Sequence, residues 1–472
     1  MLNSYEYFIF FVINVKYTKK RSSFLKKYYI CSTLRKGPPN LTLITMLKLF
    51  KTTLALLALG MLATGCSSDN NDDNNAATDD TTVQLTPGEI RLTTTQKQLV
   101  VKGNDFAFSA MQKLNDSKKD GFVFSPMSIS YLLGMVADGA DGATRTEIIN
   151  ALGAAGKSRQ ALNSFYANII LNAPNVDKDV TLEISDAFFG NTLFPARLSE
   201  SYNANLQDYF KALVEYCDFS KTQATVDRIN EWCGASSHGM IKSIGLENVL
   251  DAMWANVMLS CAYFSGAWTQ AFSEEDTQEM YFTKADGSKQ LTPMMRKIDE
   301  VLFMEDSKAK AISMPYGEGD YQMLLAMPAA GSIDDFIASL SGSRFDDIRK
   351  KLDMAATDIL MPAFSAKTEE FLRSTLSDLG IVTMFSPDAD FSPMYDAANG
   401  RQPIGDIKHV AAIEVDEHGT KAAAISSTWR YTASPGEEQA ATCQFHALSP
   451  FVYIIYQQST GAIFFMGKYN GK

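Results

Sequence analysis

Strand-like runs separated by long connections constrain the fold more than any other feature of this sequence. From about Pro87 onward, helical and strand-like patterns are mixed without strict alternation. Because distant strands can pair only through non-local contacts, this arrangement predicts an α+β domain with large mixed β-sheets. The runs that favour strands are Leu182–Ile184, Val257–Phe264, Ala311–Met314, Tyr321–Met327, Phe451–Tyr456 and Ile463–Met466.

Apolar residues at helical spacing predict helices earlier in the chain. Ile129–Ala137 has the pattern of a buried helix entered at Ser125-Pro126, with Ser128 as its cap and Asp138-Gly139 as its stop. Another helix face is formed by Phe106, Ala110, Met111 and Leu114.

A short apolar run near the N-terminus predicts export. The basic start Met46–Lys51 leads into Leu54–Met61, which is too short to span a bilayer and is typical of a secretion signal. Leu62–Cys66 then resembles the lipobox of bacterial lipoproteins, a resemblance that implies cleavage before Cys66 and lipid attached to its thiol. The alternative is a chance cysteine after an ordinary signal.

These features divide the chain into four parts. Residues 1–45 are predicted to precede the true start, although residues 1–65 could instead form one unusual anchor. The segment 46–65 is the signal peptide, and 66–88 is a disordered acidic and polar tether, because it lacks the apolar residues needed to fold. The folded domain covers 89–472. The expected location is therefore outside the inner membrane, anchored by lipid to the cell envelope, at the outer membrane or cell surface.

Charge and cysteine spacing exclude several functions. Residues 1–65 hold ten Lys and Arg against one acidic residue, which leaves 33 basic and 53 acidic residues, a net charge of −20. So acidic a domain is unsuited to bind nucleic acid, whose phosphates require cations. No CxxC spacing occurs, so we expect single buried or partly buried thiols, no metal and no cofactor; the cysteines beyond Cys31 and Cys66 are Cys217, Cys233, Cys261 and Cys443.

Enzyme motifs are absent from the sequence. None of the four histidines belongs to an HExxH motif, and no GxSxG occurs. The sequence therefore predicts a protein that is not an enzyme. A surface lipoprotein that binds a glycan or a peptide is the main alternative from another functional class.

Many short motifs follow one another in a fixed order along about residues 90–470. The last signature reads HVAAIEVDEHGT from His409 to Thr420 and is followed by a segment ending in Phe465-Met466-Gly467. The earlier motifs are Phe124–Ile129, Ala137–Ala140, Thr144–Glu147, Ile229–Trp232, His238–Ile241, Tyr263–Trp268, Pro293–Met295, Met314–Tyr316, Met361–Phe364, Leu379-Gly380 and Ala389–Ser392. In this order they resemble the serpin family of protease inhibitors. The resemblance implies a monomer with the serpin fold, in which helices pack around large mixed β-sheets and a reactive-centre loop is exposed.

The residues after the HVAAIEVDEHGT signature are small and free of proline. In a strand, one face would carry Thr420, Ala422, Ala424, Ser426 and Thr428, so the segment could slide between two existing strands without steric conflict. Gly419 provides a backbone pivot before it. Considered by propensity alone, the segment favours an alanine-rich helix or a flexible surface loop.

The resemblance assigns a mechanism to this segment. A serine or cysteine protease cuts the loop and forms an acyl-enzyme, and the hinge then inserts as a central strand, trapping the covalent complex before water releases it. Thr420 is expected to enter the sheet first, on its buried side. The hinge comprises Glu417, Gly419, Thr420, Ala422, Ala423 and Ala424. The expected scissile bond is Ala433-Ser434, with Tyr431 and Arg430 as alternatives, and no residue of this chain is catalytic.

The resemblance also implies a buried cluster that lets the sheet strands part: Ser125, Ser128, Ser260, His409 and Trp268. The chain departs from the family pattern at Ser260, where asparagine is usual, and at Ser265, where lysine is usual. Non-inhibitory serpins exist, but the small hinge residues favour inhibition here.

Overall fold

The computed structural model describes residues 83, 88–118, 120–395, 403–420 and 441–471. Several predicted features lie outside these residues: the segments 1–45 and 46–65, most of 66–88, and the lipidation site Cys66. The same is true of the loop positions Ala422, Ala423, Ala424, Arg430, Tyr431, Ala433 and Ser434. Within the described part of the chain, no helix is both long and apolar enough to cross a membrane.

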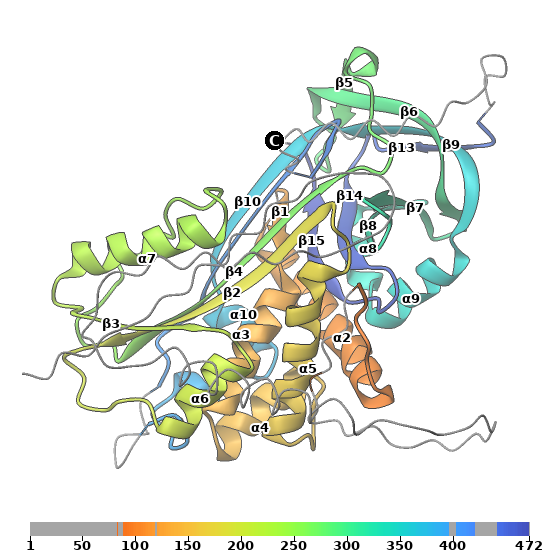
Figure 1. Ribbon diagram of the computed structural model, residues 1–472. Helices are drawn as coiled ribbons and strands as arrows, with labels where there is room; N and C mark the ends of the chain where they lie inside the picture. The colour runs from red at the N-terminus through yellow and green to blue at the C-terminus, as the bar shows by residue number, and fades with distance from the viewer. Residues whose placement is uncertain (1–82, 84–87, 119, 396–402, 421–440, 472) are drawn as a thin grey trace, which may run out of the picture. The chain divides into compact units, whose positions relative to one another are not determined.

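Figure 1 shows the helices of the described residues. Those of the first half are α2 (Thr94–Ser117), α3 (Pro126–Asp138), α4 (Gly142–Ala151), α5 (Arg159–Asn172), α6 (Glu200–Asp208) and α7 (Thr222–Ser236). They are followed by α8 (Ile333–Ser339), α9 (Gly342–Lys351) and α10 (Arg373–Asp378). Phe106, Ala110, Met111 and Leu114 are all buried along α2, which confirms the predicted helix face.

The cap of α3 differs from the prediction. Ser125, not Ser128, is the cap: its Oγ accepts a hydrogen bond from the Ser128 backbone N–H at 3.2 Å. Pro126 explains the shift, because its fixed φ and missing N–H suit the first position of a helix, which places the cap one residue before it. Every residue of α3 is buried, so the helix forms part of the core.

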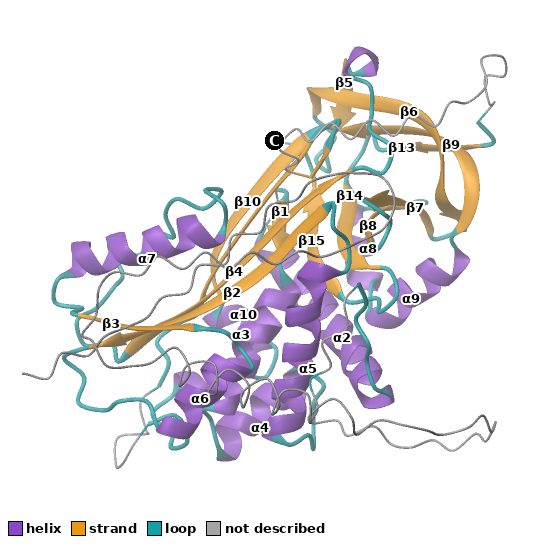
Figure 2. Ribbon diagram, in the orientation of Figure 1, coloured by secondary structure: helices purple, strands orange, loops and turns teal. Residues whose placement is uncertain are grey.

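The described strands form a six-stranded and a nine-stranded sheet, coloured orange in Figure 2. The six-stranded sheet has the order β10 (Phe364–Phe371), β11 (Lys408–Val415), β12 (Gly419–Thr420), β4 (Asn256–Ala267), β2 (Val180–Asn191) and β3 (Leu213–Cys217). The other sheet runs β1 (Phe122–Phe124), β15 (Ile463–Tyr469), β14 (Phe451–Gln457), β8 (Tyr321–Pro328), β7 (Ala309–Tyr316), β6 (Lys289–Glu305), β9 (Asp353–Pro362) and β13 (Cys443–His446), with β5 (Gln278–Thr283) paired to β6. Each predicted strand run lies inside one of these strands, and the α+β class is confirmed.

The six-stranded sheet separates two apolar clusters. Along β4, Met258, Ala262 and Phe264 face the large cluster, to which α3 and α5 also contribute, whereas Leu259 and Cys261 face a smaller cluster under α7. Figure 1 shows α7 on one side of β2 and β4, and α3, α4, α5 and α6 on the opposite side. The alternation of side chains along a strand therefore decides which helix layer each residue meets.

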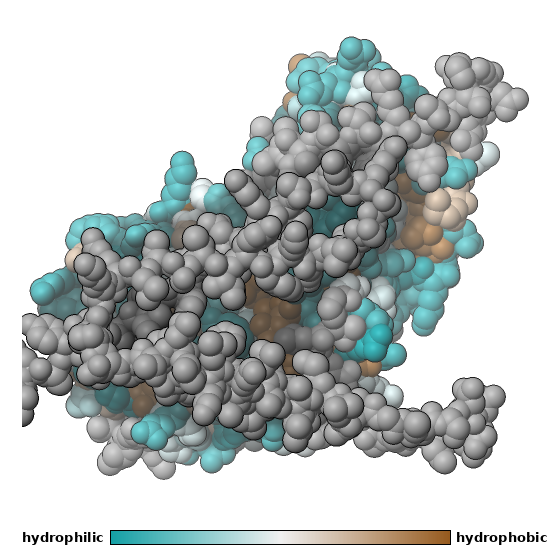
Figure 3. Space-filling view, viewed as in Figure 1, coloured by the Kyte–Doolittle hydropathy of each residue, from teal (hydrophilic) through white to brown (hydrophobic). Residues whose placement is uncertain are grey.

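The surface and the cysteines fit a compact domain of this class. Where Figure 3 shows described residues, hydrophilic side chains dominate and apolar ones occupy small areas. The cysteines of the described residues are all free. Cys233 and Cys261 are buried, whereas Cys217 and Cys443 are half-buried, as expected for single thiols.

Candidate functional site: the hinge and the strands that flank it

Two residues of the predicted hinge already form a strand. Gly419 and Thr420 make up β12, which pairs with β11 through Val415 and with β4 through Gly266 and Ala267. Among the described residues, β11 and β4 are joined in the sheet only through β12. Thr420 was expected to enter the sheet on cleavage, but the structure places it there beforehand with 1% of its surface exposed. Insertion would thus begin with the residue after it.

Gly419 is required by the close approach of β4. Its φ is +154°, and a Cβ at this position would lie 2.1 Å from the Gly266 carbonyl oxygen. Any side chain here would push β12 away from β4, since the clash is with backbone. The pivot expected from the sequence therefore also fixes how tightly the hinge packs.

Aromatic side chains hold Thr420 in place. Its Oγ1 lies 2.5 Å from the Tyr316 hydroxyl, and the Tyr316 ring stacks on Trp268 with ring centroids 4.4 Å apart. The indole Nε1–H of Trp268 in turn donates to the Asp416 carbonyl oxygen at 3.0 Å. Trp268 thus connects the end of β11 to the hinge.

Glu417 is fixed by neighbouring loop residues. Its carbonyl oxygen accepts from the Phe272 N–H at 2.9 Å, and its carboxylate accepts from the Thr277 hydroxyl at 2.6 Å. These bonds join the turn between β11 and β12 to the segment that follows β4. The hinge therefore starts from an anchored turn.

The predicted sheet-opening cluster is brought together at the start of α3, with one exception. The Ser125 N–H donates to His409 Nε2 at 3.2 Å, and the Ser128 hydroxyl donates to Ser260 Oγ at 2.9 Å. His409 belongs to β11 and Ser260 to β4, so α3 is bonded to both strands that flank β12. We call these four buried residues the α3 tether.

Trp268 does not belong to the α3 tether. It follows Ser260 by eight residues, and at about 3.3 Å per residue along a strand the two are roughly 26 Å apart. The sequence motif could not reveal this separation, because grouping residues by family role ignores the length of β4. The structure assigns Trp268 to the hinge instead.

Burial keeps the tether uncharged at neutral pH. Desolvation lowers the pKa of His409 to about 4, because an imidazolium would lose its hydration inside the domain. Its Nε2 is then free to accept from Ser125, as the 3.2 Å contact requires.

Sequence reasoning missed Asp186, which pairs with Ser260 in the register of β2 and β4. It is 2% exposed, and burial raises the pKa of its carboxyl to about 8. The signal was present in the sequence, since Asp186 alternates in phase with Leu182, Ile184 and Phe188 on a face that must meet the core.

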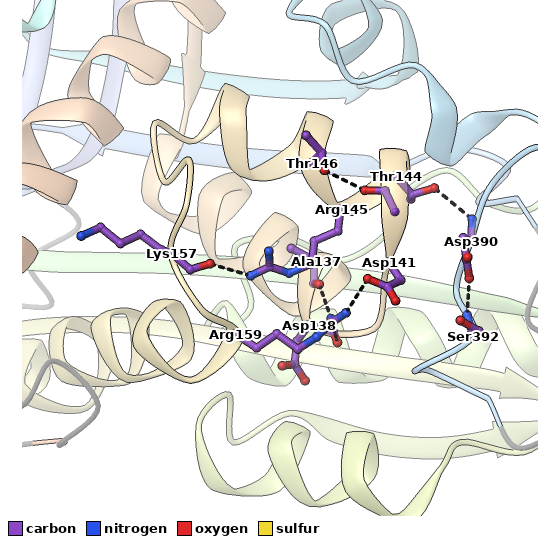
Figure 4. A network of polar contacts seen from close by, with 11 residues as sticks. Ala137, Asp138, Asp141, Thr144, Arg145, Thr146, Lys157, Arg159, Asp390 and Ser392 are labelled. Carbon is purple, nitrogen blue, oxygen red and sulfur yellow. Dashed lines mark hydrogen bonds and ion pairs between the residues drawn. The ribbon is translucent and has the colours of Figure 1, made fainter.

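Several motif residues away from the hinge serve the fold. Arg159 donates to the carbonyl oxygens of Ala137 and Asp138 at the end of α3, at 3.0 and 2.5 Å. Thr144 Oγ1 accepts from the Asp390 N–H at 2.9 Å, which joins α4 to the distant Ala389–Ser392 motif. Figure 4 shows this network around the turn between α3 and α4. These contacts fix the position of α3, and through it the tether.

Comparison with known proteins agrees with this architecture. The family model described as "Serpin (serine protease inhibitor)" matches residues 102–471. The chain is 28% identical over 382 residues to Iripin-2 of Ixodes ricinus, covering 79% of this chain and 94% of that protein. It is 26% identical over 378 residues to an uncharacterized serpin-like protein of Methanosarcina acetivorans, covering 78% and 85% of the two chains.

Solved structures show the same fold. The thermophilic serpin Tengpin in its native state superimposes with a TM-score of 0.73 at 25% identity, covering 83% of this chain and 98% of Tengpin. Thyroxine-binding globulin in complex with thyroxine has a TM-score of 0.70 at 22% identity, covering 79% and 99% of the two chains. The match over most of the chain, together with the shared fold, shows that this protein belongs to the serpin family of serine protease inhibitors.

Proposed function

We propose that this protein inhibits a serine or cysteine protease as a suicide substrate. The observation that carries the proposal is β12: two buried residues already lie between β11 and β4, and the chain continues into small residues that could extend this strand. Strand addition of this kind gains main-chain hydrogen bonds on both sides of the new strand.

The proposed reaction begins at the Ala433-Ser434 bond. The hydroxyl or thiol of the protease attacks the carbonyl carbon of Ala433, and the C–N bond breaks. The Ser434 nitrogen takes up a proton and becomes a new N-terminus, while Ala433 stays bound to the protease as an ester or thioester. The hinge is then free to extend β12, carrying the attached protease with it.

The α3 tether is proposed to control when the sheet opens. Extending β12 separates β11 from β4, and the tether bonds one strand through His409 and the other through Ser260. At least one of these hydrogen bonds must break or slide. Each contributes about 1 kcal/mol, so the tether resists spontaneous opening without preventing opening driven by strand insertion.

We propose a signal peptide at 46–65, a lipid anchor at Cys66 and an acidic and polar N-terminal tether over 66–88, distinct from the α3 tether. A monomeric inhibitor domain covers 89–472. Two acyl chains or more give stable anchoring, because each buried methylene contributes about 0.8 kcal/mol.

The proposal is tested by incubating the protein with a panel of serine and cysteine proteases. The expected result is an SDS-stable adduct with at least one of them, together with a released peptide whose mass identifies the cut. A protease whose nucleophile is chemically blocked is the control and should form no adduct. Cleavage of the loop by every protease without any adduct would show that the protein is a substrate and not an inhibitor.

A further inference from the structure

Asp186 is a carboxylic acid buried beside the α3 tether without a compensating charge. It lies on β2 opposite Ser260 of β4. Within the described residues neither of its oxygens has a hydrogen bond of normal geometry, although the Ser260 hydroxyl interacts with the group. A carboxylate at this position would lose its hydration without gaining partners, so the neutral acid is favoured.

The groups that face Asp186 cannot neutralise a negative charge. Tyr131 of α3 and Tyr202 of α6 are themselves acids. Burial raises the pKa of both; Asp186 adds to the rise at Tyr131, and Asp138, Tyr395 and Asp186 add to it at Tyr202. Their hydroxyls also donate elsewhere, Tyr131 to the Tyr209 carbonyl and Tyr202 to the Met135 carbonyl, each at 3.0 Å.

The strand neighbours offer no cation either. The pKa of Cys261 on β4 is raised, first by burial and then by Cys233, Asp186 and Glu183. His409 on β11 is neutral above about pH 4. No lysine or arginine of the described chain forms an ion pair with Asp186, whose pKa is shifted by burial and by Ser260 alone.

We propose that Asp186 is the proton-sensitive member of the sheet-opening machinery: its neutral form, beside the tether residue Ser260, favours the closed sheet, and its ionisation favours the sheet in which β11 has parted from β4. This inference rests on the proposed insertion mechanism. The neutral acid can exchange a hydrogen bond with Ser260, which already accepts from Ser128. The ionised form can only accept hydrogen bonds. It is stabilised in the parted sheet, where the separation of β11 from β4 admits water.

The direction of the pH effect follows from proton linkage. The closed sheet holds the Asp186 proton with a pKa of about 8, against 3.8 for a hydrated aspartate. The closed form therefore binds more protons between these two values, so the ratio of parted to closed protein rises about tenfold per pH unit from about pH 4 to about pH 8. Above about pH 8 Asp186 is ionised in both forms, so it no longer changes the ratio of parted to closed protein.

His409 opposes this effect in acid. Its pKa is about 4 when closed against 6.5 when hydrated, so protonation favours the parted form as pH falls through that interval. Between pH 6.5 and 8, only Asp186 changes its charge within the tether region. Measurements in this window isolate its contribution.

The protonation state is tested first, on the full chain, by infrared spectroscopy of the carboxyl C=O stretch. The wild type should show a neutral carboxyl band at pH 7 that vanishes above about pH 8 and is missing in Asp186→Asn. The control Asp179→Asn removes an exposed carboxylate just before β2 and should keep the band. Identical spectra of wild type and Asp186→Asn at pH 7 would overturn the proposal. If Asp186→Asn does not fold, Asp186→Ser replaces it.

The effect on the sheet is tested without a protease. A synthetic peptide of residues 422–433, acetylated and amidated so that its ends do not titrate, competes for the gap that the hinge would fill. Its rate of annealing, followed on native gels, should rise about sixteenfold from pH 6.5 to pH 8 in the wild type and stay constant in Asp186→Asn.

The outcomes separate the two proposals. An equal pH dependence in both proteins would refute the role of Asp186 and leave insertion standing. Failure of the peptide to anneal with either protein at any pH would refute insertion, and with it the role of Asp186 in sheet opening.

Discussion

Replacing Thr420 by arginine tests whether a small, uncharged residue is needed at the start of the inserted strand. Thr420 is buried in β12, and its one polar side-chain contact among the described residues is the Tyr316 hydroxyl. The Asp416 carboxylate already accepts the N–H groups of His418 and Gly419. An arginine would therefore bury its cation with little compensation or pull β12 out of the sheet.

The size of the effect follows from the burial. An uncompensated buried charge costs several kcal/mol, and the lost hydrogen bond to Tyr316 adds about 1 kcal/mol. If residue 420 must return to β12 before the strand can be extended and this costs about 3 kcal/mol, insertion slows roughly 150-fold, since each 1.36 kcal/mol is a factor of ten in rate. Hydrolysis of the acyl-enzyme then overtakes insertion.

The assay measures how the cleaved protein divides between adduct and product. Thr420→Arg should be cut at the wild-type bond and release active protease, whereas Thr420→Val, which loses only the hydroxyl, should still trap most of it. Lys421→Glu, predicted by strand alternation to face away from the buried side, is the matched charge control. An SDS-stable adduct of Thr420→Arg at the wild-type ratio would refute the insertion mechanism.

Three further predictions concern other parts of the chain. Cys66→Ala should move the protein from membrane to soluble fractions with inhibition intact, and unchanged membrane association would contradict lipid anchoring. Sequencing the new N-terminus after complex formation should give Ser434; a cut before Ser427 would leave too short a hinge and would exclude the assigned bond. The wild type should lose about 3 kcal/mol of unfolding free energy between pH 6.5 and pH 4, because the pKa of His409 is about 4 when folded and 6.5 when unfolded. His409→Gln keeps an acceptor for Ser125 and should not show this loss. Urea unfolding at both pH values measures the free energy of unfolding, and an equal loss at pH 4 in the variant would contradict this role of His409.

The sequence predicted the elements in which apolar residues repeat with a single period along the whole element. The buried face of α2 and the runs in β4, β8, β14 and β15 are of this kind, because each packs one or both faces against the core throughout its length. Strand β6 (Lys289–Glu305) escaped notice because it carries charges and Pro293 and pairs in turn with β5, β9 and β7. Its burial changes along its length, so no single period describes it.

The functional residues divide in the same way. Motif order was sufficient to associate Ser125, Ser260 and His409, since each occupies a recognisable place in the serpin pattern. The separation of Trp268 from them depends on how far β4 extends, and the neutral state of Asp186 depends on which side chains surround it in three dimensions. Neither can be deduced from local sequence, because both are set by contacts between elements far apart in the chain.

The stacking of Trp268 on Tyr316 gives the protein an intrinsic optical reporter. The fluorescence of an indole depends on the polarity and contacts of its ring, and this ring touches the residue that holds Thr420. When the hinge inserts and β12 lengthens, the environment of the Trp268 ring should change at the same rate. With the other tryptophans, Trp232, Trp254 and Trp429, replaced by phenylalanine, stopped-flow emission could follow the hinge without any added label.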